Sequence, residues 1–102
     1  MSEKIVIEVD QDLKDLIPGF LKNVQNNISI IRDSVASGDF EKVKVLGHNM
    51  KGSGGGYGFD EITSIGLSIE QAAREGNGSV ILLKLSELET YLTSIEIKYV
   101  AL

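Results

Sequence analysis

The sequence predicts an all-α protein, an antiparallel up-down bundle of four main helices preceded by a short extra N-terminal helix. Apolar residues recur at spacings of three and four along most of the chain, which is the period of an amphipathic helix. Only a few residues separate these periodic stretches, and short connections favour antiparallel neighbours. No pair of strand patterns is evident that would compete with this fold.

Length and composition point to a single small domain. The chain has 102 residues, of which 42% are apolar and 25% are charged, and this size permits one compact core. We expect an extended lead-in over residues 1–9 and one helical domain over residues 10–102. Cysteine is absent and histidine occurs once, which excludes disulfides, thiolate metal sites and any site that needs two imidazoles.

Charge and hydropathy limit the classes of binding partner and the cellular compartment that we expect. Fifteen acidic residues against ten basic ones argue against nucleic acid as the main partner. No apolar run approaches the roughly 20 residues of a membrane span, and the N-terminus lacks a signal-peptide pattern. We therefore expect a cytoplasmic protein without a membrane partner.

The first part of the chain contains the lead-in and two helices. Residues 4–9 look briefly like a strand, but no partner strand is evident and we expect extended chain. Asp10 can cap a short helix that ends at Ile17, and Pro18 suits the first turn of a second helix. Gly38 is the expected stop of this second helix. Its apolar face consists of Phe20, Val24, Ile28, Ile31 and Val35.

Three more helices follow, each with a start and a stop signal. The expected caps are Asp39, Asp60 and either Asn77 or Ser79, and the expected stops are Gly58 and Gly76. The third helix begins at Phe40, and its inner face consists of Phe40, Val43, Gly47, Met50, Gly54 and Tyr57. The fourth presents Ile62, Ile65, Ile69, Ala72 and Ala73, and the last presents Ile81, Leu85, Leu88, Leu92, Ile95 and Tyr99.

The segment 52–58 is an anomaly in this pattern, because five of its seven residues are glycines. Each glycine weakens a helix by roughly 1 kcal/mol relative to alanine, so a flexible loop after Lys51 is one interpretation. The other interpretation is a helix that keeps an uncluttered surface. The inward positions Met50 and Tyr57 stay apolar through the run, which favours the helix.

The only histidine lies on the outer side of this expected helix. At about 100° per residue, His48 points about 140° away from the inner face, and Gly52 lies opposite the core. The stripe that continues from His48 consists of Lys51, Gly52, Gly55 and Gly56. The imidazole is therefore expected on a bare helix surface beside a cation.

Nucleotide and metal sites are not supported by this stretch. G-x-G-x-x-G fits no register here, and the Gly-Lys pair of a phosphate-binding P-loop is missing from the chain. A single histidine with scattered carboxylates provides no metal-ligand spacing. We expect no ATP site, no cofactor and no metal of the chain's own.

The segment 48–53, His-Asn-Met-Lys-Gly-Ser, is followed by a glycine-rich run that ends in Tyr-Gly-Phe at 57–59. This sequence resembles the signature of the histidine-containing phosphotransfer (HPt) family, and its glycine-rich end is similar to the phosphoacceptor domain of chemotaxis histidine kinases. The resemblance covers essentially the whole chain. It implies a helical bundle with the phosphorylatable histidine exposed on its second long helix.

The resemblance also implies roles for individual residues. His48 would accept a phosphoryl group and pass it on, Lys51 would steady this group, and Gly52 would leave room for it. Glu70 matches the position that orients the imidazole, and Arg74 matches a basic residue that touches the phosphate. A carboxylate that accepts the Nδ1 proton would leave Nε2 free. From the residues alone, Glu70 stays open as a solvated glutamate and Arg74 as a cation that complements the helix dipole.

A docking surface is expected around the histidine. Leu67 points about 170° away from the apolar face of its helix and should be exposed, next to the bare positions Gly55 and Gly56. Lys44, four residues before His48, would add positive charge, although a solvated lysine is the plainer interpretation.

The function that the resemblance implies is that of a phosphorelay protein. His48 would receive its phosphoryl group from a receiver-domain aspartate or from a hybrid or chemotaxis-type histidine kinase, and would pass it to a response regulator. The chain would be a relay intermediate rather than an enzyme, with Mg²⁺ supplied by the receiver partner. A helical adaptor that binds receivers without phosphotransfer and a phosphoacceptor domain cut from a kinase remain alternatives. We expect a monomer, because the sequence has no long heptad pattern that would predict a coiled-coil dimer.

Overall fold

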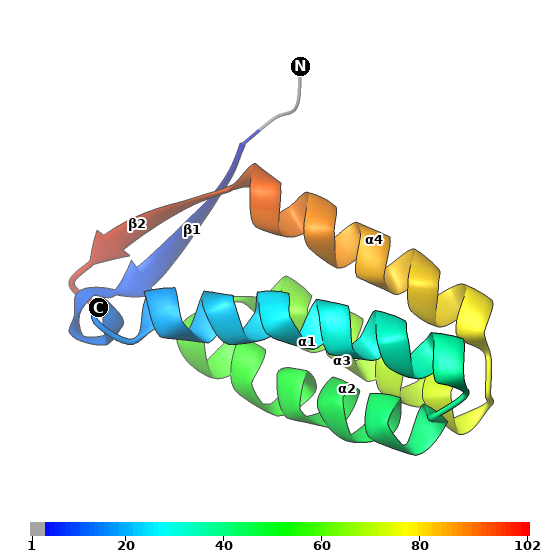
Figure 1. Cartoon of the computed structure of the whole chain (residues 1–102). Helices are drawn as coiled ribbons and strands as arrows, with labels where there is room; N and C mark the ends of the chain where they lie inside the picture. The colour runs from blue at the N-terminus through cyan, green and yellow to red at the C-terminus, as the bar shows by residue number, and fades with distance from the viewer. Residues whose placement is uncertain (1–3) are drawn as a thin grey trace.

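The structure, a computed structural model that describes residues 4–102, consists of four helices and a two-stranded sheet (Figure 1). The helices are α1 (Ile17–Ser37), α2 (Phe40–Gly54), α3 (Asp60–Arg74) and α4 (Gly78–Ser94). The strands are β1 (Ile5–Asp10) and β2 (Ile95–Val100), and short 3-10 turns form η1 (Gln11–Leu13) and η2 (Gly55–Tyr57). The expected four helices are confirmed, whereas their antiparallel up-down order stays a prediction.

The structure is mostly helical, in agreement with the all-α class, but it also contains a short strand pair that the sequence did not predict. β1 runs parallel to β2 in a register that extends from Ile5 opposite Ile95 to Asp10 opposite Val100. The expected lead-in therefore forms a strand over most of its length, and its residues 1–3 lie outside the described part of the chain. The last helix ends at Ser94, so Ile95 and Tyr99 belong to β2 and not to a helix. The alternation of apolar and charged residues over 95–99 is a strand period, and β1 supplies the partner that stabilises it.

The extra N-terminal helix is not confirmed as an α-helix. Asp10 does cap a turn, since its side chain accepts a hydrogen bond from the Asp12 amide at 3.0 Å. This turn is only the three-residue 3-10 helix η1, and α1 begins at Ile17 with Pro18 in its first turn. A segment of so few residues cannot offset the cost of nucleating a separate α-helix.

The ends of the four helices follow mostly local signals. Gly38 ends α1 in the left-handed conformation at φ 78°, and the Asp39 side chain accepts a bond from the Lys42 amide to start α2. Asn77, and not Ser79, caps α4. The expected cap at Asp60 is wrong: Phe59 precedes the first turn of α3 without a side-chain cap, and Asp60 lies inside that turn.

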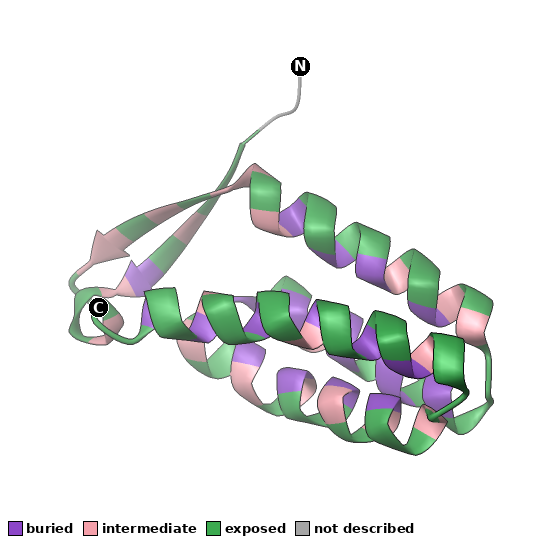
Figure 2. Cartoon of the chain, in the orientation of Figure 1, coloured by how far each residue is buried: buried purple, intermediate pink, exposed green. Residues whose placement is uncertain are grey.

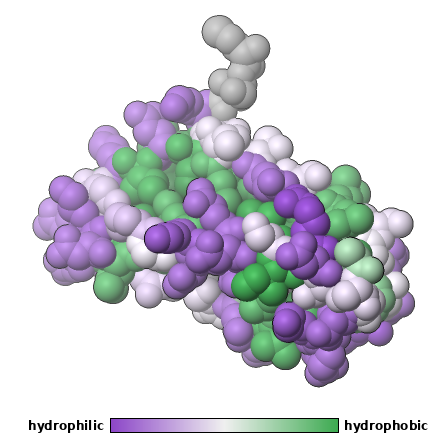
Figure 3. All heavy atoms as spheres, viewed as in Figure 1, coloured by the Kyte–Doolittle hydropathy of each residue, from purple (hydrophilic) through white to green (hydrophobic). Residues whose placement is uncertain are grey.

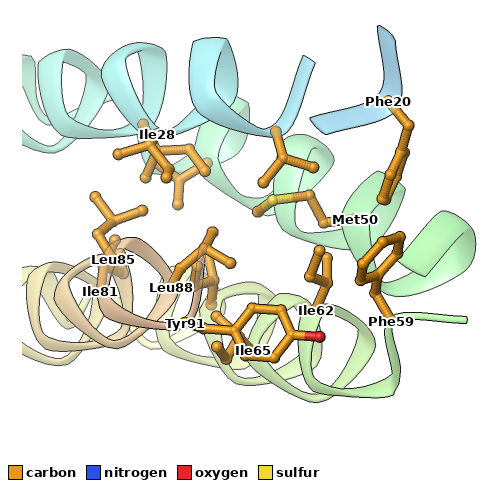
Figure 4. Packing of buried hydrophobic residues seen from close by; sticks show 14 of the residues in the cluster. Phe20, Ile28, Met50, Phe59, Ile62, Ile65, Ile81, Leu85, Leu88 and Tyr91 are labelled. Atoms are coloured by element: carbon orange, nitrogen blue, oxygen red, sulfur yellow. The ribbon is translucent and has the colours of Figure 1, made fainter. Parts of the chain in front are cut away.

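The buried residues lie along the inward faces of the helices (Figure 2). The expected faces are buried except for residues that are only partly covered, which are Val35, Phe40, Tyr57, Leu92, Ile95 and Tyr99. Phe59 and Tyr91 are core residues that the periodic pattern did not identify. Phe59 follows the glycine turn and stacks near Phe20 at the α2 end of the core, and Tyr91 lies across Ile65 (Figure 4). Within the described residues, no helix combines the length and the apolar character needed to cross a membrane.

Candidate functional site

The histidine lies on the outer face of α2, above a buried carboxylate from α3. The side chain of His48 is 62% exposed, and its Nδ1 lies 3.0 Å from Oε2 of Glu70. The side chain of Glu70 is only 5% exposed, so the interpretation of Glu70 as a solvated glutamate is wrong. Nδ1 is therefore engaged by the protein, while most of the imidazole remains exposed.

Two cations share the carboxylate with the histidine. Nζ of Lys51 lies 2.9 Å from Oε1 of Glu70, and Nη2 of Arg74 lies 3.2 Å from Oε2. The hydrogen bond from Lys51 is the main cause that lowers the pKa of the Glu70 carboxyl, and the bond from His48 acts in the same direction, against the opposing effect of burial. An ionised carboxylate can only accept hydrogen bonds, so the Nδ1 of His48 carries the shared proton.

Glycines bring α2 and α3 close enough for this contact. A Cβ added at Gly47 would lie 2.9 Å from the Glu70 amide nitrogen, and one added at Gly66 would lie 2.6 Å from the Lys51 amide nitrogen. Both distances are shorter than side chains permit, so the backbones meet directly at these two positions. This approach places the carboxylate of Glu70 directly beneath the imidazole.

Thr63 joins the end of α2 to α3. Its hydroxyl donates to the Lys51 carbonyl oxygen at 3.0 Å and accepts from the Gly55 amide at 2.7 Å. A Cβ at Gly54 would lie 2.8 Å from the Thr63 amide nitrogen, so the threonine sits against bare backbone. These bonds hold the last turn of α2 and the start of η2 in place beside the site.

The glycine run is ordered, and neither expectation describes it fully. The loop after Lys51 is wrong, because α2 continues to Gly54. The helix expected to reach Tyr57 is also wrong, because the chain tightens into the 3-10 turn η2 and then turns at Gly58 with φ 95°. The Gly55 amide donates a hydrogen bond to the Thr63 hydroxyl, which is one reason why the α-helix ends there.

The outer positions of the run are open. A Cβ at Gly52 or at Gly56 would meet nothing within 4 Å, and one at Gly55 would lie 3.4 Å from Thr63 Oγ1. No contact within the chain explains the glycine at position 52. The open space lies along α2 one turn beyond His48.

The two remaining expected docking residues are placed differently. Leu67 on α3 is 41% exposed, as its position opposite the apolar face predicted. Lys44 pairs with Glu41 on its own helix at 3.1 Å and not with Glu70. The structure thus brings Lys51 and Arg74, but not Lys44, to the carboxylate of Glu70.

Sequence reasoning missed the residues that make the helices approach. Gly47 was placed on an inner face but not at a contact between backbones, and Gly66 and Thr63 were not singled out. The sequence does contain a signal, because Gly47 and Gly66 are isolated glycines that lie inside predicted helices without ending them. Their pairing across two helices is visible only in three dimensions. Among residues 4–102, no group of three or more His, Cys, Asp or Glu side chains is arranged to hold a metal ion.

Together, the four helices form a bundle that presents an exposed histidine hydrogen-bonded to a buried carboxylate. The Hpt domain family model matches residues 15–97, which is most of the chain, and the protein therefore belongs to the Hpt family. Members of this family are phosphorelay carriers of two-component signalling that interact with kinase and receiver proteins. Neither the comparison with curated proteins nor that with solved structures gives a match.

Proposed function

We propose that the protein is a cytoplasmic histidine phosphotransfer protein in which Nε2 of His48 accepts a phosphoryl group and passes it to a response regulator. The observation that carries this proposal is the 3.0 Å contact between Nδ1 of the exposed His48 and the buried carboxylate of Glu70. A neutral imidazole whose Nδ1 proton is donated keeps its free lone pair on Nε2. That lone pair is the nucleophile that phosphotransfer requires.

The transfer balances without a further reagent. The Nε2 lone pair forms a bond to phosphorus while the bond from phosphorus to the aspartyl oxygen of a receiver breaks, and the aspartate leaves as its carboxylate. The ring keeps the Nδ1 proton and becomes positively charged as Nε2 is phosphorylated. Glu70 stabilises this charge through the hydrogen bond that it already makes. Reversal of the same steps delivers the group to an aspartate of the next receiver.

Three nearby residues have supporting roles in this proposal. Lys51 and Arg74 carry positive charge to the edge of the imidazole and offset the charge of the phosphoryl group in a protein with a net charge of −5. Gly52 leaves the approach to Nε2 uncovered. Gly55, Gly56 and Leu67 form the surface on which a receiver docks, and Lys44 lies at its border.

We infer the partners from what phosphotransfer needs besides the histidine, namely a phosphoryl donor, an acceptor and Mg²⁺. The donor is a receiver aspartyl phosphate or a hybrid or chemotaxis-type histidine kinase, and the acceptor is a response-regulator receiver. Mg²⁺ and the acidic pocket that holds it are supplied by the receiver, so the chain is a relay intermediate and not an enzyme.

The experiment is phosphorylation of the purified protein by a phosphorylated receiver and, separately, by a kinase catalytic domain with ATP. We expect one acid-labile, base-stable phosphoryl group that maps to His48. His48→Gln should abolish labelling while the protein stays folded, because the side chain is exposed. Labelling that survives in His48→Gln would reject the proposal, and receiver binding without any labelling of the native protein would favour a non-catalytic adaptor.

A further inference from the structure

The two-stranded sheet has one edge that nothing in the described chain covers. The sheet contains only β1 and β2. The outer side of β1 lies against the glycine turn, since a Cβ at Gly58 would be 3.4 Å from the Glu8 carbonyl oxygen. Figure 1 shows β2 as the outer strand, with no element of residues 4–102 beyond it. A row of unpaired amides and carbonyls of this kind is a template for another strand.

The sequence of β2 is complementary to itself in one register. Residues 95–99 read Ile-Glu-Ile-Lys-Tyr, which alternates apolar residues with one acid and one base. In an antiparallel pair centred on Ile97, Glu96 faces Lys98 of the second strand on both sides of the axis. Glu96 and Lys98 are both exposed, and neither has an ion-pair partner among the salt bridges of the described residues. Opposite charges directly across two strands stabilise the pairing.

β1 also has a self-complementary register, centred on Val6, in which Glu8 would face Lys4 of a second copy. The charge pattern therefore does not distinguish the two strands. The outer side of β1 lies against the glycine turn, whereas the outer side of β2 is open among the described residues, so the covered edge singles out β2.

The apolar residues of β2 support the same pairing. Ile95, Ile97 and Tyr99 are only partly buried against the core. In the register centred on Ile97, each Ile95 faces Tyr99 of the other copy and the two Ile97 side chains meet at the axis. Figure 3 shows apolar surface gathered where Figure 1 places the sheet and the adjoining end of α4. Extension of the sheet would cover part of this surface.

We propose that β2 pairs antiparallel with β2 of a second copy of this chain, centred on Ile97, to form a symmetric dimer with a four-stranded sheet. The interface is the same on both copies, as two-fold symmetry requires. α2, the helix that carries His48, lies across the bundle from β2 in Figure 1. The expectation of a monomer considered helical seams only, and this interface is a strand edge. The proposal does not depend on phosphotransfer.

The first test is sedimentation equilibrium of the full chain from micromolar to millimolar concentration. We expect a concentration-dependent dimer that Glu96→Lys weakens by about tenfold or more, because the introduced base would face Lys98 of the other copy. Glu75→Lys at the exposed end of α3 makes the same change of charge and should leave association unchanged. A native protein that is monomeric throughout, or equal association in the two variants, would overturn the proposal.

The second test exchanges the charges. Glu8→Lys combined with Lys98→Glu keeps the opposite charges of the paired positions 8 and 98 with their signs reversed. This double variant should be monomeric alone, because Glu96 would face an acid, and should form a mixed dimer with Glu96→Lys. Circular dichroism verifies that both proteins are folded. If the mixture does not associate, or if hydrogen exchange in the native dimer is slowed elsewhere than in residues 95–100, the proposed interface is wrong.

Discussion

Gly47 and Gly52 lie five residues apart on the same helix and have opposite surroundings. A Cβ at Gly47 would press against the backbone of α3 at 2.9 Å, whereas one at Gly52 would meet nothing within 4 Å. Glycine weakens a helix by roughly 1 kcal/mol at either position. At Gly47 the close approach of α3 offsets this cost and brings Glu70 under His48. At Gly52 no contact within the described chain offsets it, which supports the proposal that this position stays bare for the group or partner that approaches His48.

The largest effect is expected where the two helices touch. Gly66→Ala should lower the free energy of unfolding by about 1–3 kcal/mol, because the new Cβ would lie 2.6 Å from the Lys51 amide nitrogen and backbone atoms cannot move aside cheaply. Urea denaturation measures this change. Gly52→Ala is the matched control and should raise stability by up to about 1 kcal/mol. An unchanged or raised stability in Gly66→Ala would remove the distinction between the packed and the open glycines.

The open side is expected to matter for binding. Leu67→Asp should weaken receiver binding about tenfold, which corresponds to about 1.4 kcal/mol, because a charge replaces an exposed apolar side chain on α3, the helix that carries Glu70. Its melting temperature should stay close to that of the native protein, since Leu67 is 41% exposed. Leu83→Asp on α4 changes another exposed leucine and should leave receiver binding intact. A lower melting temperature with unchanged affinity would assign Leu67 to the core.

A smaller effect separates stability from transfer. Gly52→Gln should preserve or raise the free energy of unfolding, by up to about 1 kcal/mol, and should slow phosphotransfer because its side chain enters the open space beyond His48. Gly19→Gln on α1 is the matched control, since a Cβ there also meets nothing within 4 Å. Rapid-quench transfer assays and urea denaturation are made on both variants. Normal transfer in Gly52→Gln would contradict the role of the open stripe.

The smallest effect concerns the pH dependence of stability. The pKa of Glu70 in the folded protein is below its ordinary value of 4.5, so its contribution to stability is present above about pH 4.5 and is lost as the pH falls through the lowered pKa. Glu70→Gln cannot titrate at this position. The advantage of the native protein over Glu70→Gln in urea denaturation should therefore shrink on acidification. A difference that stays constant with pH would show that the carboxylate does not titrate in this way.

Local patterns predicted the helices well and the sheet poorly. The apolar faces of α1 and α3 and the caps at Asp39 and Asn77 depend on residues within one or two turns, so their spacing in the sequence is sufficient. β1 and β2 are each short and stand at opposite ends of the chain. Their pairing depends on a helical bundle that brings the two ends of the chain together. No local sequence pattern predicts that these two segments lie side by side.

The candidate site was predictable in its exposed half. The spacing of His48, Lys51 and Gly52 on one helix placed them on an outer stripe, because helical geometry alone determines that direction. The buried half depends on α3. Glu70 reads as a polar helix residue in sequence, and only the contact of Gly47 with α3 turns it into a carboxylate enclosed under the imidazole.

The sequence by itself determined which residues face inward on each helix, where most helices begin and end, and which face of α2 presents the histidine. These features follow from interactions between residues three or four positions apart. The tertiary structure decided the parallel strand pair, the burial of Phe59 and Tyr91, and the bonds of Glu70 to partners from α2 and from its own helix. Apart from the bond between Glu70 and Arg74, which are four residues apart, each of these joins segments that are distant in sequence. The contact of Glu70 with α2 further depends on how closely Gly47 and Gly66 allow the two backbones to approach.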